Sequence, residues 1–154
     1  MSILGKNGLG NLLKIILICS FILGIPLIVV MPFLLNHVNN VYASMFIIYP
    51  NGILMLGIVY QFIKLFKSLE DNNPFNYTNV KIMKVTGIIS FIMSILWIID
   101  LLFMIFIMHN MHVNYIIVLI FLGVLFFGVS IALYILSELL RQATEYKDEN
   151  DLTI

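Results

Sequence analysis

Two long stretches without charge constrain the fold of this chain more than any other feature. Between Lys14 and Lys64 there is no Lys, Arg, Asp or Glu. Between Lys84 and Glu138 the only charged residue is Asp100. Each stretch is about twice the roughly 20 residues that one helix needs to cross a bilayer. Each is therefore expected to cross the membrane, turn through a short uncharged segment and cross back.

The sequence predicts an all-α membrane protein with four transmembrane helices, folded as one domain over residues 1–154. Of these residues 62% are hydrophobic and 10% are charged, whereas soluble domains are about half apolar and a quarter charged. The hairpin turns place the four spans near residues 12–35, 44–66, 85–108 and 115–137. Residues 138–154 are expected to extend the last helix beyond the membrane as a tail.

The positions of the basic residues predict the orientation. The two hairpin turns contain none of them, and all eight lie on the opposite side of the predicted membrane. Because short loops rich in Lys and Arg stay in the cytoplasm, we expect both termini to be cytoplasmic and the protein to lie in the cell membrane. The eight residues are Lys6, Lys14, Lys64, Lys67, Lys81, Lys84, Arg141 and Lys147.

Asp100 is the one ionisable side chain predicted to lie inside the hydrocarbon, where such groups are costly and often functional. Counting 1.5 Å per helical residue places it level with Tyr49 and Asn51 of the second span, and either could hydrogen-bond its carboxyl. No Lys or Arg is predicted at that depth, so burial favours a neutral carboxyl. Two interpretations stay open: a staple between helices or a proton relay.

The second hairpin turn combines two Met and two His residues: Met108, His109, Met111 and His112. Thioether and imidazole ligands suit Cu(I), but no Cys or carboxylate completes a site there. These four residues are weak candidate ligands, and the sequence predicts neither a metal nor a cofactor.

Small residues recur on one face of the last two spans. Gly123, Ser130 and Ser137 are seven residues apart, and Ser90 and Ser94 lie one helical turn apart in the third span. Small residues on a helix face allow helices to approach closely in a membrane, so we interpret these positions as sites of helix packing.

The central loop and the C-terminus carry a family resemblance. The loop contains Pro74-Phe75 followed by Asn79 and a basic stretch, and the chain ends in Glu-Asn-Asp-Leu-Thr-Ile after Ser-Glu-Leu-Leu-Arg-Gln at 137–142. These segments resemble the domain-of-unknown-function 2975 family of four-span bacterial membrane proteins. Its members are often encoded beside helix-turn-helix regulators of the XRE type. The resemblance implies a membrane partner that holds or modulates a DNA-binding protein, and it supplies no catalytic residues.

The expected function is therefore that of a non-enzymatic membrane partner, because no nucleophile–base pair or paired carboxylates face one site. A net charge of zero argues against direct binding of nucleic acid. Alternatives are a small proton-coupled transporter working as a homo-oligomer, an immunity-type membrane protein, and a tail that only solvates the last helix. The expected docking residues are Pro74, Phe75, Glu145, Asp148, Glu149, Asn150, Asp151, Leu152, Thr153 and Ile154.

Overall fold

The computed structural model describes residues 9–34, 41–70, 74–107 and 113–151, and over these residues it contains four helices and no strand. All four helices are long and apolar enough to cross a membrane by length and composition. The predicted all-α membrane fold with four helices is thus confirmed. The helices are α1 (Leu9–Leu34), α2 (Val41–Glu70), α3 (Tyr77–Ile107) and α4 (Val113–Asp151).

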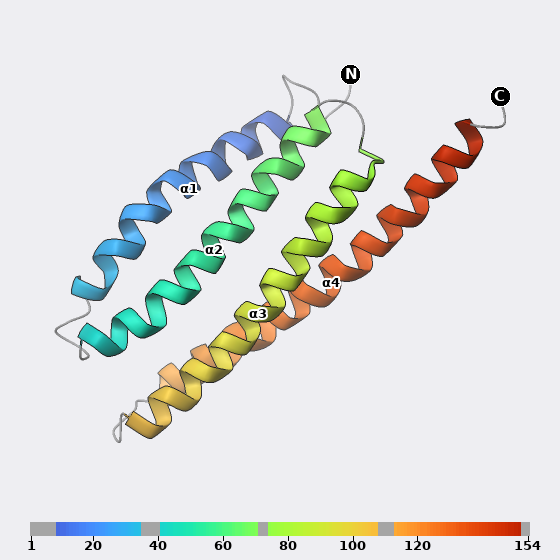
Figure 1. Cartoon of the computed structure of the whole chain (residues 1–154). Coiled ribbons are helices and arrows are strands. Elements are labelled where there is room, and N and C mark those ends of the chain that lie inside the picture. The colour runs from blue at the N-terminus through green and yellow to red at the C-terminus, as the bar shows by residue number, and fades with distance from the viewer. Residues whose placement is uncertain (1–8, 35–40, 71–73, 108–112, 152–154) are drawn as a thin grey trace.

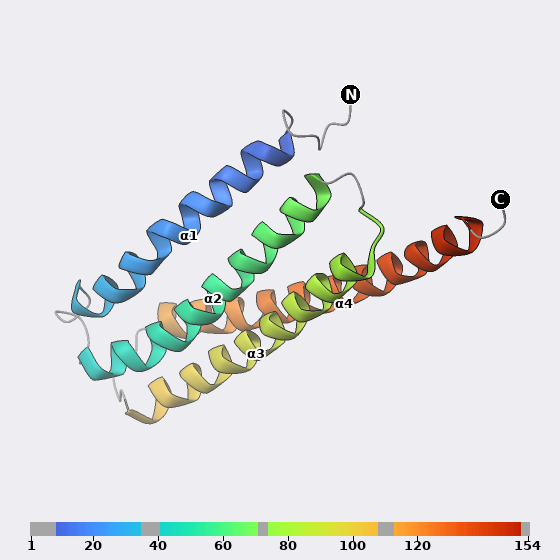
Figure 2. The same cartoon turned by 45° about the horizontal axis from the view of Figure 1, so that its top comes forward.

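The four helices lie in a row in chain order and do not close into a bundle (Figures 1 and 2). Among the described residues, α1 packs on α2 alone, α2 packs on α1 and α3, and α4 packs on α3 alone. Helix α1 begins and α4 ends at the end of the molecule where α2 leads into α3 (Figure 1). We call it the lysine end, because the basic residues of the described chain lie there: Lys14, Lys64, Lys67, Lys81, Lys84, Arg141 and Lys147.

The contact between α3 and α4 is built from small residues. The Ser94 hydroxyl donates a hydrogen bond to the carbonyl oxygen of Gly123 at 2.9 Å. A Cβ added to Gly87 would lie only 3.4 Å from the carbonyl oxygen of Ser130. The two backbones therefore approach closely, as small residues permit. Four buried residues of α4 along this contact recur every seven residues: Gly123, Ser130, Ser137 and Thr144.

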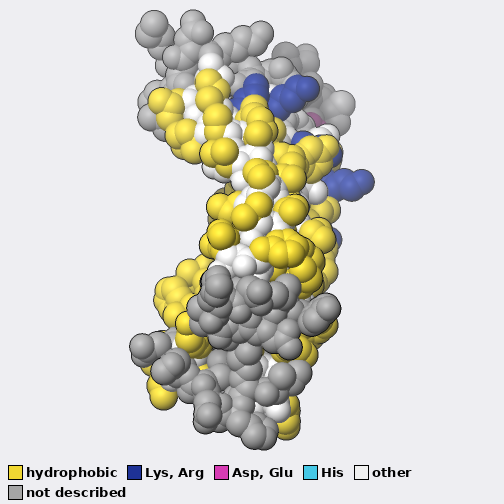
Figure 3. All heavy atoms as spheres, turned by 90° about the vertical axis from the view of Figure 1, so that its left-hand side faces the viewer, with side chains coloured by type: hydrophobic (Ala, Val, Ile, Leu, Met, Phe, Trp, Pro, Cys, Tyr) yellow, Lys and Arg dark blue, Asp and Glu magenta, His cyan; other side chains and the backbone are white. Residues whose placement is uncertain are grey.

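Helix α1 is held by α2 and otherwise exposes apolar side chains. A Cβ on Gly52 of α2 would lie 2.7 Å from Cγ1 of Ile28, so the glycine makes room for α1. Other large side chains of α1, such as Ile22 and Leu23, are more than half exposed. Viewed from the α1 side, the middle of the molecule is covered by hydrophobic atoms, with Lys and Arg only near the lysine end (Figure 3). Such a surface requires lipid as its solvent.

Helices α3 and α4 extend beyond the predicted spans at the lysine end. Helix α3 begins at Tyr77, ahead of the predicted span start at residue 85, and α4 continues past residue 137 to Asp151. Asn76 caps the start of α3, because the Asn79 N–H donates to Oδ1 of Asn76 at 2.8 Å, which satisfies a donor in the first turn.

Replacing Gly87 by Leu should loosen the contact between α3 and α4. The new side chain would meet backbone atoms of α4, which cannot move aside as a side chain can. We expect a loss of about 1–3 kcal/mol in the free energy of unfolding, measured by unfolding in detergent micelles. Gly128→Leu is the matched control, since nothing lies within 4 Å of a Cβ at that position. Equal losses in the two variants would contradict this packing.

Candidate functional site

The buried polar pair of the membrane region consists of Asp100 on α3 and Asn51 on α2, which are 3% and 6% exposed. The Asn51 side-chain amide donates to Oδ2 of Asp100 at 2.5 Å. It also donates to the carbonyl oxygen of Ile47 in its own helix at 2.9 Å. Both amide protons are thereby used, and the pair ties α2 to α3 within the membrane.

The surroundings of Asp100 resemble a structural staple more than a relay. The Oδ1 atom of Asn51 is buried and has no hydrogen-bond partner. Tyr49 is half-buried, and none of the hydrogen bonds within the described chain joins it to Asp100. Among the hydrogen bonds of the described residues, Asn51 is the side-chain partner of the Asp100 carboxyl. A proton path needs a succession of exchangeable groups, and this pair alone supplies a single step.

The candidate metal ligands Met108, His109, Met111 and His112 lie outside the described residues. Within the described part of the chain, no cluster of three His, Cys, Asp or Glu side chains could hold a metal ion.

At the lysine end, the segment before α3 is fixed by side-chain amides. The Asn79 amide donates to the carbonyl oxygen of Pro74 at 2.9 Å, and the Asn76 amide donates to the Ser68 hydroxyl of α2 at 3.3 Å. Phe75 projects from this segment with 44% of its surface exposed. The predicted docking residues Pro74 and Phe75 are therefore accessible on a well-anchored turn.

The extension of α4 begins with an ion-pair cluster around Arg141. Its guanidinium donates to Glu138 at 2.6 Å and to Glu145 at 2.5 Å. These bonds hold the pKa of the Glu138 carboxyl below its usual range and raise the pKa of Arg141. One arginine thus offsets much of the negative charge of two glutamates, so the first turns of the extension are nearly balanced in charge.

The acidic character of the extension lies in its last turns. Asp148, Glu149 and Asn150 are exposed there. Asp151 ends the helix, and the remaining predicted docking residues, Leu152, Thr153 and Ile154, lie outside the described residues.

The predicted docking turn and the tail are connected through α3. Helix α4 stays packed on α3 as far as Thr144, which is 1% exposed, whereas α2 and α4 make no close contact among the described residues. Sequence spacing did not identify Thr144 as a packing residue, although it continues the seven-residue spacing of Ser130 and Ser137.

A family model described as protein of unknown function (DUF2975) matches residues 31–154. The match covers α2, α3 and α4 and only the last residues of α1. No curated protein and no solved structure matches the chain.

The Asn51–Asp100 hydrogen bond should contribute measurably to stability. Asp100→Ala and Asn51→Ala should each destabilise the protein, and a double-mutant cycle should give a coupling of about 0.6–1.7 kcal/mol, the range for interhelical hydrogen bonds in membranes. Asp100→Asn serves as the control, because an amide oxygen can still accept the Asn51 proton. A coupling free energy close to zero, measured by unfolding in detergent micelles, would show that the hydrogen bond does not stabilise the protein.

Proposed function

This chain belongs to the DUF2975 family of proteins of unknown function, and we propose that it is a non-enzymatic membrane partner of a small cytoplasmic DNA-binding regulator. The observation that carries the proposal is the charged extension of α4, which continues as a helix from Glu138 to Asp151 beyond the apolar span. Figures 1 and 2 show it projecting past the start of α3. A helix that leaves the membrane in this way offers a surface to a soluble partner.

We infer that the lysine end faces the cytoplasm. All the Lys and Arg of the described residues lie at this end, and basic residues near the ends of spans are retained on the cytoplasmic side. A cytoplasmic partner would then meet the Phe75 turn and the α4 extension. On the other side the chain offers two short turns, too little for a standard interface of about 800 Å² per partner.

The chemistry of the extension suits a basic partner. Arg141 offsets Glu138 and Glu145, and the sequence of the last turns adds three further acidic residues, Asp148, Glu149 and Asp151. A DNA-binding domain is basic where it meets phosphate, and complementary charge steers such a surface towards an acidic one. Binding here would compete with DNA for the regulator.

A second candidate function, a small proton-coupled transporter, is favoured by the buried carboxyl of Asp100. Carboxyls inside membrane spans often mark ion pathways. A transporter of this size would work as a homo-oligomer, and the open row of helices leaves the outer faces of α1 and α4 available for a second copy. This function differs from the first in requiring proton movement that depends on Asp100.

The orientation can be tested with single cysteines in a background where Cys19 is replaced by Ser. Cysteines at Asn39 and Asn114 should react with a membrane-impermeant reagent added to intact cells. Cysteines at Asn73 and Asn150 should react only after the membrane is opened. Labelling at Asn73 in intact cells would show that the lysine end faces outwards, and the basis for a cytoplasmic partner would be lost.

Deleting residues 150–154 should leave membrane insertion intact and release the partner. Full-length protein purified from its native host should retain a small DNA-binding protein, and added salt should weaken the complex because charge attraction is screened. Neutralising Asp148, Glu149 and Asp151 to amides should weaken retention, and reversing them to Lys should weaken it further.

The cysteine assay on each tail variant serves as the control for insertion. If the deletion variant retains every protein that copurifies with the full-length chain, the extension is only a solvated helix end and the proposal is wrong.

A further inference from the structure

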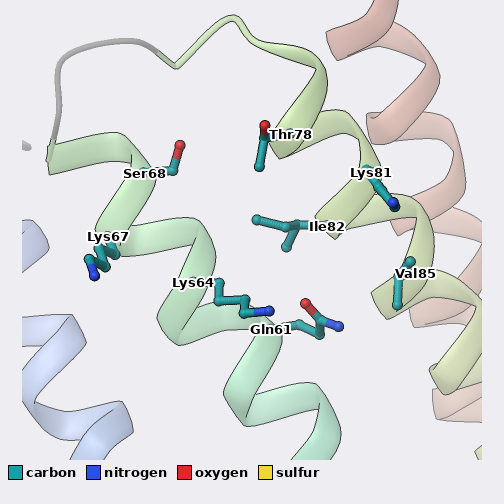
Figure 4. A pocket seen from close by; sticks show the side chains of 8 residues that line it. All are labelled: Gln61, Lys64, Lys67, Ser68, Thr78, Lys81, Ile82 and Val85. Atoms are coloured by element: carbon teal, nitrogen blue, oxygen red, sulfur yellow. The ribbon is translucent and has the colours of Figure 1, made fainter.

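The lysine end contains a groove between the end of α2 and the start of α3, with a volume of about 460 Å³. Its polar lining comes from both helices: Gln61, Lys64, Lys67 and Ser68 from α2, and Thr78 and Lys81 from α3. Figure 4 shows Lys64 and Gln61 pointing into the gap between the helices, whereas Lys67 and Lys81 lie at its two sides with their ammonium groups directed away from it. The groove therefore has one inward ammonium group, two lysines at its rim and three neutral polar side chains.

The positive charge of the groove is not balanced within the described residues. Lys64, Lys67 and Lys81 form no salt bridge there. The Lys64 ammonium lies 4.7 Å from the ring centroid of Tyr60, one helical turn closer to the apolar span. A cation–π contact of an exposed Lys is worth only about 0.5–1 kcal/mol, which leaves the charge available to an anion.

The neutral polar groups can also serve an anion. The Ser68 hydroxyl already accepts a hydrogen bond from the Asn76 amide, so its own proton is free to be donated. Thr78 opens the first turn of α3 and lines the same groove. Flexible lysine stems let the two rim ammonium groups swing towards a bound oxyanion. Hydroxyl and ammonium donors together match the oxygens of a phosphate group.

The position of the groove indicates which phosphate it meets. It lies at the lysine end, where the apolar spans end and lipid headgroups are expected, and Ile82 and Val85 add an apolar lining. Val85 belongs to a helix whose next turns expose Ile92 and Ile99 at seven-residue spacing from it, a surface suited to acyl chains. Basic pockets between transmembrane helices bind anionic headgroups in this way. A soluble phosphate would use the donors but not the apolar wall.

We propose that the groove formed by Lys64, Lys67, Lys81, Ser68 and Thr78 binds the headgroup of an anionic phospholipid. The headgroup phosphate bridges the end of α2 and the start of α3, and the acyl chains descend past Val85 towards Ile92. This inference does not depend on a protein partner or on which side of the membrane the lysine end faces.

The test uses the full-length chain purified in a neutral detergent, with phosphatidylglycerol and phosphatidylcholine of identical acyl chains as probes. Native mass spectrometry counts bound lipids and gives their affinities. We expect phosphatidylglycerol to bind more tightly than phosphatidylcholine. The triple variant Lys64→Gln, Lys67→Gln, Lys81→Gln should bind it about 100-fold more weakly, since each lysine near an anionic surface contributes roughly fivefold.

The charge-matched control changes Lys14, Lys84 and Lys147 to Gln, which removes the same charge outside the groove and should leave the affinity within a few-fold of the original. The single variant Lys64→Gln, with an expected loss of about fivefold, keeps the test valid if the triple variant does not fold. Equal binding of the two lipids, or equal losses in groove and control variants, would overturn the proposal. Displacement of phosphatidylglycerol by inorganic phosphate would assign the groove to a soluble phosphate and refute the lipid assignment.

Discussion

Close approach of the α3 and α4 backbones is the constraint on which the rest of the structure depends. In lipid, apolar side chains gain little by moving from acyl chains to another helix, so association relies on tight packing and hydrogen bonds. Small residues and Gly87 bring the two backbones together, and the Ser94–Gly123 hydrogen bond crosses between them. The buried side chains are accordingly more often polar or small than large and apolar. Once α3 is fixed on α4, its other face is available to receive α2 through Asn51.

Much of the architecture could be predicted from charge alone. The charge-free stretch between Lys14 and Lys64 predicts two membrane crossings, because it is about twice as long as one transmembrane helix. Counting residues along each span placed Asn51 and Asp100 at the same depth in the membrane, and in the structure the two side chains form a hydrogen bond. Sequence spacing also identified Ser90, Ser94 and the Gly123 series as packing residues.

Other features depend on which helices become neighbours, and one sequence does not specify that. The open row was not predicted. Helices that are apolar on all sides do not indicate which faces pack together, so the sequence is equally compatible with a closed bundle. The lysine groove was missed for the same reason. Lys64 and Lys81 are separated by the central loop, and their side chains line one cavity only because α2 and α3 pack side by side. The hydrogen bond from the Asn76 side-chain amide to the Ser68 hydroxyl of α2 depends on that same packing.

Helix α3 carries both features that give the lysine end its chemistry. Its first turns form one wall of the basic groove, and its opposite side supports α4 as far as Thr144. Hydrogen bonds of the Asn76 and Asn79 side chains hold the preceding turn against the start of the same helix. The proposed lipid site and the proposed protein-docking surface therefore both contact α3, and this helix fixes how the two lie relative to each other.

The hydrogen bond between Asn51 and Asp100 also bears on how the protein is made. Asn51 precedes Asp100 by 49 residues, so α2 with its amide is synthesised before the acidic helix α3. A charged residue inside a span is costly to insert, by about 2.5–3.5 kcal/mol at the helix centre, and a hydrogen-bonding partner on a neighbouring helix offsets part of such a cost. The earlier hairpin therefore carries the group that satisfies the acidic side chain of the later one.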